Sequence, residues 1–377
     1  MQWDVLERGR TAIVRRRGRF LVAELDGPHL VVSTSIFNGG QTERVRFLLN
    51  HQSCEGAGHE ARAHASFARD PRAYHEAVCA EGEVPADGTA VMGTAANMNY
   101  AAIAIERDAD VSVTAVVTAG VQHNATCAGD PAQWRETRDG VVKVPAIAGT
   151  INTMLIVDVP VTPAALARAI VTMTEGKSAA LQRLAIPSGA SADLATGTGT
   201  DQFCVAAPLR DDPPLTSASP HMKFGEIVGL AVRTATLEAL RWQNGLEASY
   251  TRSVFHALGR YGLDESAIAD DLAAHMTPAD LDLLRRNSKS AFYEPMAGAA
   301  AHALAAVLDR ARHGTLPSSV IRDATIQHAA TLATALAAQP HRWTEFRARL
   351  HDTGSADPKT LVLAAIALGW SEKWPSS

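Results

Sequence analysis

The sequence predicts an α+β fold: an N-terminal β-meander and mixed sheet layered with helices, followed by an all-helical C-terminal extension. Three short strand-like runs open the chain, separated by Arg17-Gly18 and Asp26-Gly27-Pro28, which is typical of strands joined by tight turns. Later strands and long helices follow at irregular spacings, which favours α+β over a regular βαβ alternation. After Gly245 the strand-like runs disappear and alanine-rich helical segments dominate. We therefore expect two domains, residues 1–245 and 246–377.

The elements of the first domain follow from hydrophobic patterning and turn residues. Thr162-Pro163 and Ser219-Pro220 each supply an N-cap followed by a proline suited to the first helical turn. The polar region 127–140 is expected to be a loop. The expected strands are 11–16, 19–25, 29–35, 89–92, 111–118, 149–158 and 202–207, and the expected helices are 43–50, 67–80, 97–106, 162–184 and 219–244.

The C-terminal extension shows helix signals throughout. Thr277-Pro278-Ala279-Asp280 resembles a capping box before a helix over 281–286. Further helices are expected over 296–313, 320–338 and 359–368. We expect this extension to be a structural cover or a dimer surface, with a lid over a large substrate as the alternative.

Composition limits the possible partners and the compartment. The 377 residues are 46% hydrophobic and 20% charged, with a formal charge of -5, which favours neither nucleic acid nor an anionic membrane as a partner. The most continuous apolar stretch, 361–370, is too short to span a bilayer, and residues 1–8 lack the apolar core of a signal peptide. Four cysteines without a C-x-x-C pair fit reduced thiols. A cytoplasmic protein is the expectation.

Two polar residues interrupt an otherwise apolar strand and helix. Asn152 lies in the aliphatic run 149–158, and Lys177 shares one helical stripe with apolar residues of 162–184. A lysine at the edge of an apolar stripe usually extends its ammonium group to solvent, so on this pattern alone a site is the weaker interpretation.

Other polar stretches have ordinary structural explanations beside the functional ones. The histidines and cysteines between His51 and Cys79 match no zinc spacing, and ordinary surface histidines are the better explanation. Residues 196–201 lack the third glycine of a dinucleotide motif and lead into a strand, but they form a tight loop that delivers Asp201. His123 follows a strand end, where a structural role is at least as good an explanation. His221 is expected in the first turn of a helix, where the dipole favours its neutral form.

Six blocks of the chain, taken together and in order, resemble the adenosylcobinamide amidohydrolases over about residues 11–245. The blocks are Asn38-Gly39-Gly40; Thr118-Ala119-Gly120-Val121 with Asn124-Ala125 and Ala128-Gly129-Asp130; Gly149-Thr150-Ile151-Asn152-Thr153; Thr174-Glu175-Gly176-Lys177-Ser178-Ala179-Ala180-Leu181; Ala195-Thr196-Gly197-Thr198-Gly199-Thr200-Asp201; and His221-Met222-Lys223-Phe224-Gly225-Glu226-Ile227-Val228-Gly229.

The resemblance implies an enzyme of corrinoid salvage. Such enzymes hydrolyse the amide between the aminopropanol arm and the corrin ring of adenosylcobinamide, and the adenosylcobyric acid re-enters coenzyme B12 synthesis. The corrinoid is then the substrate and not a cofactor. A homodimer is compatible with the sequence, and a non-catalytic corrinoid carrier or sensor is the alternative function.

Amide hydrolysis requires an activated nucleophile, a stabilised oxyanion and a proton for the departing amine. With the resemblance as guide, His221 and His123 are the expected base and acid, supported by Glu226, Asp201 or Asp130. Lys177, Lys223 and Asn124 are expected to stabilise the oxyanion or to bind substrate amides. Thr150 or Thr200 is an alternative nucleophile, and a divalent metal held by His123, His221 and acidic neighbours is a further alternative. Asn38, Asn152 and Glu175 complete the expected substrate-binding set.

Overall fold

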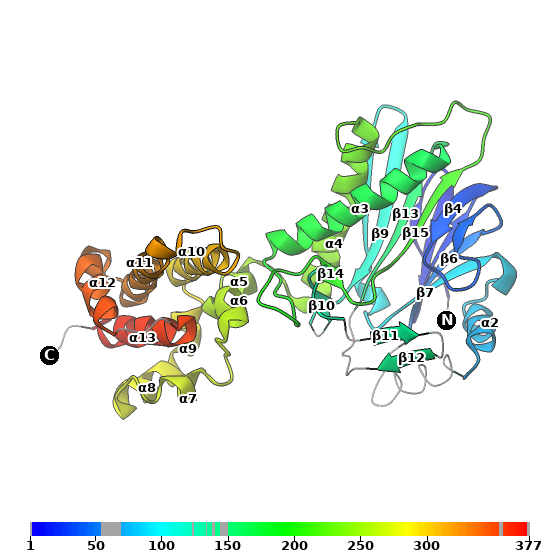
Figure 1. Cartoon of the computed structure of the whole chain (residues 1–377). Helices are drawn as coiled ribbons and strands as arrows, with labels where there is room; N and C mark the ends of the chain where they lie inside the picture. Colours follow the sequence, from blue (N-terminus) through cyan, green and yellow to red (C-terminus); the bar gives the residue numbers. More distant parts are fainter. Residues whose placement is uncertain are drawn as a thin grey trace. The chain divides into compact units, whose positions relative to one another are not determined.

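A computed structural model describes residues 2–53, 69–122, 124–132, 134–137, 140–143, 150–353 and 357–374. The chain divides into two compact units. The first comprises Met1–Ala190 and Leu194–Gly245, and the second comprises Leu246–Ser377 with the short segment Ser191–Asp193. The α+β class predicted from the sequence is confirmed, because mixed sheets with helices are followed by a mostly helical region (Figure 1).

The first sheet has five strands in the order β1-β2-β3-β6-β7. All neighbours are antiparallel except β6 and β7, which run parallel. The first two strands of the predicted meander, 11–16 and 19–25, are confirmed as the antiparallel pair β2 and β3. The third, 29–35, is a strand but belongs to the second sheet, and β1 was not predicted. The strands are β1 (Asp4–Arg8), β2 (Ala12–Arg17), β3 (Phe20–Leu25), β6 (Phe47–Gln52) and β7 (Thr89–Thr94).

The second sheet has six strands in the order β5-β4-β15-β13-β9-β8, and only β13 and β15 run parallel. Two short ribbons, β10 with β14 and β11 with β12, lie outside it. The strands are β4 (His29–Ser33), β5 (Gly40–Thr42), β8 (Ala102–Asp108), β9 (Val111–Ala119), β10 (Ala125–Thr126), β11 (Trp134–Thr137), β12 (Gly140–Lys143), β13 (Ile151–Val157), β14 (Gly197–Thr198) and β15 (Gln202–Pro208).

The two sheets pack face to face around the main core of the first unit. Leu48 and Met92 from the five-stranded sheet belong to the same buried cluster as Val116 and Met154 from the six-stranded sheet. Helix α2 (Pro71–Glu81) covers the outer face of the first sheet, where Val78 packs with other apolar residues. Helices α3 (Pro163–Arg183) and α4 (Lys223–Asn244) cover the other face of the second sheet (Figure 1).

Helix α3 begins as predicted, because the Thr162 side chain accepts the backbone N–H of Ala165 at 3.2 Å. It crosses α4 at a very short distance. A Cβ added to Gly176 would lie 2.7 Å from the carbonyl oxygen of Gly229. This close approach fixes α3 against α4, and it therefore also fixes the position of Lys177, the next residue.

Three predictions of secondary structure in this unit are wrong. Residues 43–50 are not helical but lead into β6, which is buried on both faces, and a continuous apolar run does not distinguish such a strand from a helix. Residues 97–106 form a short 3-10 turn (Met98–Tyr100) and then β8, whose alanine–isoleucine alternation has the period of a strand. The expected loop over 127–140 contains the first strand of the β11–β12 hairpin.

The start of α4 also differs from the prediction. Ser219 and Pro220 precede the helix, whose N-cap is Met222 and whose cap lacks a side-chain hydrogen bond. His221 therefore lies outside the first helical turn. The predicted end at Gly245 is confirmed, because this glycine adopts a left-handed conformation with a φ of 65°.

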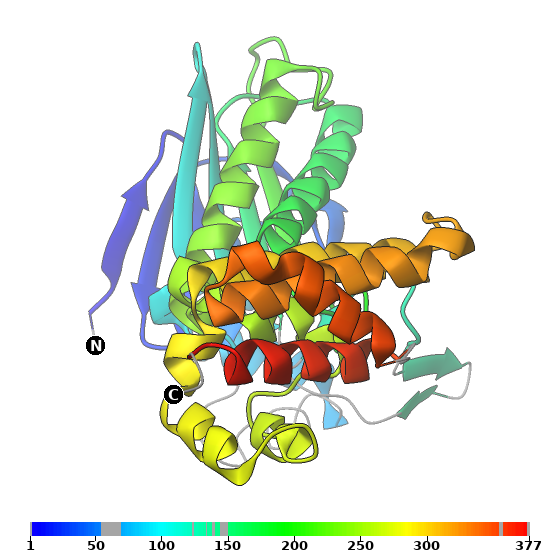
Figure 2. The same cartoon turned by 90° about the vertical axis from the view of Figure 1, so that its left-hand side faces the viewer.

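In its described residues, the second unit contains helices and connecting turns around its own apolar core, which includes Phe292, Leu304 and Phe346. Helix α11 contacts α10, α12 and α13, the last drawn in red in Figure 2. The Thr277 cap is confirmed, since its hydroxyl accepts the N–H of Asp280 at 3.2 Å. The helices are α5 (Ala248–Thr251), α6 (Val254–Leu258), α7 (Ile268–Leu272), α8 (Pro278–Arg286), α9 (Ser288–Phe292), α10 (Pro295–Arg312), α11 (Ser318–Ala337), α12 (Trp343–Asp352) and α13 (Pro358–Ser371).

Candidate functional site

A polar cluster lies at one end of the six-stranded sheet, where β9 ends and where β13 and β15 begin. This edge of the sheet is formed by strand termini and not by an outermost strand. Strand β13 is antiparallel to β9 and parallel to β15, so Ala119, Ile151 and Gln202 reach the same edge. The N–H of Gly120 donates to the carbonyl of Thr150 at 3.0 Å and joins two of the loops that leave this edge. Each of these loops belongs to one of the sequence blocks described above.

Asp201 is the centre of the cluster. Its Oδ1 accepts the backbone N–H of Ile151 at 3.0 Å and the Thr198 hydroxyl. Its Oδ2 accepts the N–H of Thr198 at 3.1 Å and is ion-paired with Lys177 Nζ. With four donors, both carboxylate oxygens are engaged. Asp201 is therefore an anchor for the loop and for Lys177 rather than a free proton acceptor.

Lys177 projects from α3 toward this loop. Its side chain is 14% exposed and that of Asp201 is 19% exposed, so the pair is largely removed from water. In such a poorly solvated place, separating the two charges would leave each of them without a partner, which costs free energy of folding. The geometry of the pair is therefore important for stability. Gly197 keeps the space open: a Cβ at this position would lie 2.7 Å from Lys177 Nζ.

Two threonine hydroxyls lie beside the ion pair. Thr150 and Thr200 share a short hydrogen bond between their Oγ1 atoms, and the Asn124 side-chain amide donates to Thr200 Oγ1 at 3.3 Å. Thr150 is buried, whereas Thr200 is exposed. The structure thus brings together five residues singled out from the sequence: Lys177, Asp201, Thr150, Thr200 and Asn124.

Asn152 belongs to a buried polar layer directly beneath this edge. Its side-chain nitrogen donates to Asn50 Oδ1 at 2.9 Å and to the Gly93 carbonyl at 3.0 Å. Asn50 in turn donates to the Thr118 hydroxyl at 2.7 Å. Asn152 Oδ1 is buried without a hydrogen-bond partner in the described part of the chain. Sequence reasoning missed Asn50, although an asparagine inside the apolar run of β6 was the available signal.

Asn38 and Asp130 hold loops in place. The Asn38 side chain donates to the carbonyls of Ala86 and Thr89, both at 2.9 Å. Asp130 Oδ2 accepts the N–H of Cys127 at 2.7 Å and the Ser188 hydroxyl at 2.6 Å. Glu175 is exposed on α3. Through these hydrogen bonds, Asn38 and Asp130 hold neighbouring loops in place.

The block around His221 lies elsewhere. Lys223 Nζ pairs with Glu226 at 2.8 Å on the exposed first turn of α4, and this hydrogen bond raises the pKa of Lys223. The other end of α4 contacts the edge described above, because Asn244 Oδ1 accepts the N–H of Val121 at 3.2 Å. A helix of 22 residues is about 33 Å long. The structure therefore separates His221, Lys223 and Glu226 from the edge to which Asn124 belongs.

His123 lies outside the described residues, as do Cys54, His59 and His64. His51 and His75 are both buried, so the prediction of surface histidines is wrong for them. His51 stacks on Phe20 with ring centroids 5.1 Å apart, and His75 Nε2 lies 3.1 Å from the Ala86 carbonyl oxygen. Within the described ranges, no three His, Cys, Asp or Glu side chains come together as metal ligands. Nor does any helix in those ranges combine the length and apolarity needed to cross a bilayer.

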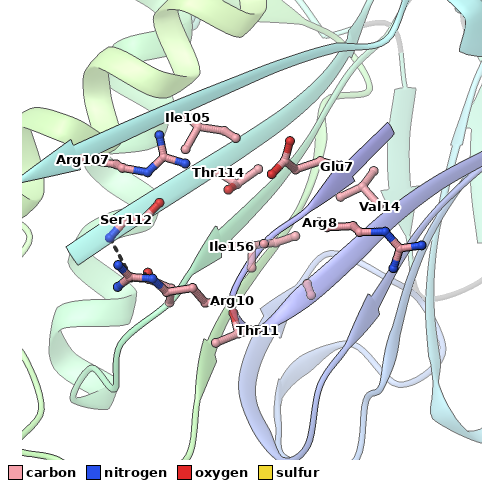
Figure 3. A pocket seen from close by; sticks show the side chains of 13 residues that line it. Glu7, Arg8, Arg10, Thr11, Val14, Ile105, Arg107, Ser112, Thr114 and Ile156 are labelled. Carbon is pink, nitrogen blue, oxygen red and sulfur yellow. Dashed lines mark hydrogen bonds and ion pairs between the residues drawn. The ribbon is translucent and has the colours of Figure 1, made fainter. Parts of the chain in front are cut away.

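A small pocket opens at the opposite edge of the two sheets (Figure 3). Asp158, which follows the end of β13, lines it together with Arg107 of β8 and Glu7 of β1. Ser112 donates its backbone N–H to Asp158 Oδ1 at 2.6 Å. The residues of the Lys177–Asp201 cluster do not line this pocket. Sequence reasoning did not single it out.

The protein thus has an α+β fold with a polar cluster at one sheet edge. The chain belongs to the adenosylcobinamide amidohydrolase (CbiZ) family, whose model matches residues 6–248. It is 37% identical over 167 residues to the uncharacterized protein MJ1613 of Methanocaldococcus jannaschii, a match that spans 42% of this chain and 65% of that protein. Among solved structures, the PH0078 protein of Pyrococcus horikoshii aligns with a TM-score of 0.30 at 13% identity, covering 63% of this chain and 82% of that one.

Proposed function

We propose that this chain hydrolyses the amide between the aminopropanol arm and the corrin ring of adenosylcobinamide, giving adenosylcobyric acid and aminopropanol for corrinoid salvage. Membership of the family supports the reaction class. The observation that supports a working site in this chain is the desolvated Lys177–Asp201 pair beside Thr150, Thr200 and Asn124. In this proposal the corrinoid is bound as substrate.

Lys177 is the proposed oxyanion-stabilising group. Attack on an amide carbonyl places negative charge on its oxygen, and a fixed positive charge in a water-poor site stabilises that charge. The Asp201 carboxylate orients the ammonium group, and the hydrogen bonds from the loop backbone hold Asp201 in place. Lys177 therefore acts as a positioned cation and does not serve as a base.

The proposed nucleophile is a water molecule oriented by the Thr200 hydroxyl. As its oxygen bonds to the carbonyl carbon, a base takes one proton, and the C–N bond breaks as that proton reaches the amine nitrogen. Asp201 already accepts four hydrogen bonds, so it is poorly suited to take this proton. His123 is the proposed base. This assignment rests on the sequence, in which His123 is adjacent to Asn124.

A specific observation favours one rival mechanism: Thr200 is exposed and its hydroxyl lies within the cluster. If Thr200 itself attacks, a corrinoid acyl group becomes covalently attached to the protein. Rapid acid quenching during turnover followed by intact-protein mass spectrometry distinguishes the two routes. An adduct on Thr200 favours the threonine nucleophile, and turnover without any adduct favours water.

Incubation of the protein with adenosylcobinamide tests the function itself. Hydrolysis gives adenosylcobyric acid, which chromatography with mass detection identifies. The competing function is a non-catalytic corrinoid carrier or sensor. Tight binding of adenosylcobinamide without product would support the carrier and contradict the proposed enzyme.

A further inference from the structure

The loop between β4 and β5 presents an apolar side chain to solvent. Ile36 is 67% exposed, the largest value among the large hydrophobic residues that the structure describes. Single exposed apolar residues are ordinary on protein surfaces and need no explanation by themselves. Two further observations distinguish Ile36: the rigidity of its loop and the place to which that loop leads.

The loop is held firmly on both sides of Ile36. The Ser35 hydroxyl donates to the Phe37 carbonyl at 2.6 Å and accepts the N–H of Val91 at 2.9 Å. Asn38 adds its two hydrogen bonds to the carbonyls of Ala86 and Thr89. The Phe37 ring packs on the His75 ring, with centroids 5.2 Å apart. Ile36 is thus exposed on a loop whose neighbouring residues are fixed.

The loop emerges at the edge that carries the Lys177–Asp201 cluster. Strand β4 is antiparallel to β15, with Ser33 opposite Cys204, and the N–H of Thr34 donates to the Phe203 carbonyl at 3.0 Å. Residues after Thr34 therefore pass beyond the start of β15, where Gln202 follows Asp201. Strand β7 reaches the same place, because the N–H of Gly93 donates to Gln202 Oε1 at 2.9 Å.

We propose that Ile36 is an apolar contact for the substrate and a determinant of specificity for the corrin ring. This inference rests on the proposed function. The cluster at the edge offers charged and hydroxyl groups, whereas a large, flat macrocycle also requires apolar surface to be removed from water. A side chain on an already ordered loop supplies that contact with little loss of conformational entropy on binding.

Substitution of Ile36, matched with Leu209 as control, tests the inference. Leu209 is also an exposed apolar residue (38%), but it follows the end of β15 at the opposite edge of the same sheet. We expect Ile36→Asp to raise KM for adenosylcobinamide about tenfold and Ile36→Ala about threefold, with kcat within about twofold of wild type. Leu209→Asp and Leu209→Ala leave both parameters unchanged.

The outcomes separate this inference from the function on which it rests. If the wild-type protein turns over and Ile36→Asp has a wild-type KM, Ile36 is not a substrate contact. If the wild-type protein gives no product, the proposed enzyme fails, and equilibrium dialysis with adenosylcobinamide then tests Ile36. Weaker binding by Ile36→Asp than by Leu209→Asp supports the contact, and equal binding or no binding overturns it.

Discussion

The Lys177 ammonium is ion-paired with the Asp201 carboxylate, whose other oxygen accepts the backbone N–H of Ile151 at 3.0 Å. One side chain thus joins α3, the loop before β15 and the start of β13. Because Asp201 both supports the loop and orients Lys177, structural and catalytic consequences of substitution have to be separated experimentally.

Paired substitution of Lys177 and Asp201 separates them. Lys177→Met leaves a mostly buried carboxylate unpaired and should lower the free energy of unfolding by about 1–3 kcal/mol. Replacing both residues, Lys177→Met with Asp201→Asn, removes both charges and should recover part of that loss. Activity should fall at least ~100-fold in the single and in the double variant, because the proposed oxyanion contact is absent from both.

Chemical denaturation and steady-state kinetics measure these two effects. Recovery of activity together with stability in the double variant would show that Lys177 has only a structural role.

The Thr200 hydroxyl is expected to matter more for turnover than for stability. Thr200→Val removes the exposed hydroxyl while keeping the branched shape, so the melting temperature should change little while kcat falls about 100-fold. Thr200→Ser, which keeps a hydroxyl, is the matched control and should retain most activity. Wild-type kcat in Thr200→Val would exclude this hydroxyl from the reaction.

His221 provides a direct test of the separation along α4. Its position at the far end of the helix predicts that His221→Ala leaves kcat/KM within about twofold of wild type, although the sequence blocks alone assign it acid or base chemistry. Glu226→Gln is the companion variant, since Glu226 pairs with Lys223 on the same exposed turn. A loss above ~100-fold in either variant would mean that the α4 start contributes to a site that one chain does not complete.

The stability of the second unit is expected to depend on pH through the ionisation of Asp309. Burial opposes ionisation of this carboxyl, but hydrogen bonds from Arg260 and Tyr261 outweigh it and hold its pKa below the ordinary value. A carboxyl with a depressed pKa stabilises the fold above its unfolded-state pKa, about 3.9, and the contribution is lost as pH falls through the folded-state pKa.

Asp309→Asn should therefore destabilise the second unit by about 2 kcal/mol at pH 7, with the difference from wild type shrinking below about pH 4. Thermal unfolding across this pH range measures the difference, and a gap that persists unchanged to pH 2 would contradict the assignment.

Local signals predicted much of the fold and part of the site. The α+β class followed from turn residues and periodicity, and Thr162 capped α3 as its hydroxyl chemistry required. Strand β6 was mistaken for a helix because burial on both faces removes the alternation that identifies a strand. Asn124, Thr150, Lys177, Thr200 and Asp201 were named from the sequence.

The convergence of those five residues depends on the pairing of β9, β13 and β15, which a one-dimensional pattern does not contain. For the same reason, the sequence pattern did not predict that His221 lies far from this cluster. Its spacing along the chain gave no indication that α4 would separate it from Asn124.

We propose that the edge carrying the Lys177–Asp201 cluster hydrolyses a corrinoid amide. The most direct measurement is mass-resolved chromatography of adenosylcobinamide incubated with the wild-type protein and with the Lys177→Met, Asp201→Asn double variant. We predict equimolar adenosylcobyric acid and aminopropanol from the wild type and at most ~1% of that rate from the variant. Intact adenosylcobinamide recovered from a wild-type protein that binds it tightly would show that the cluster does not hydrolyse this amide.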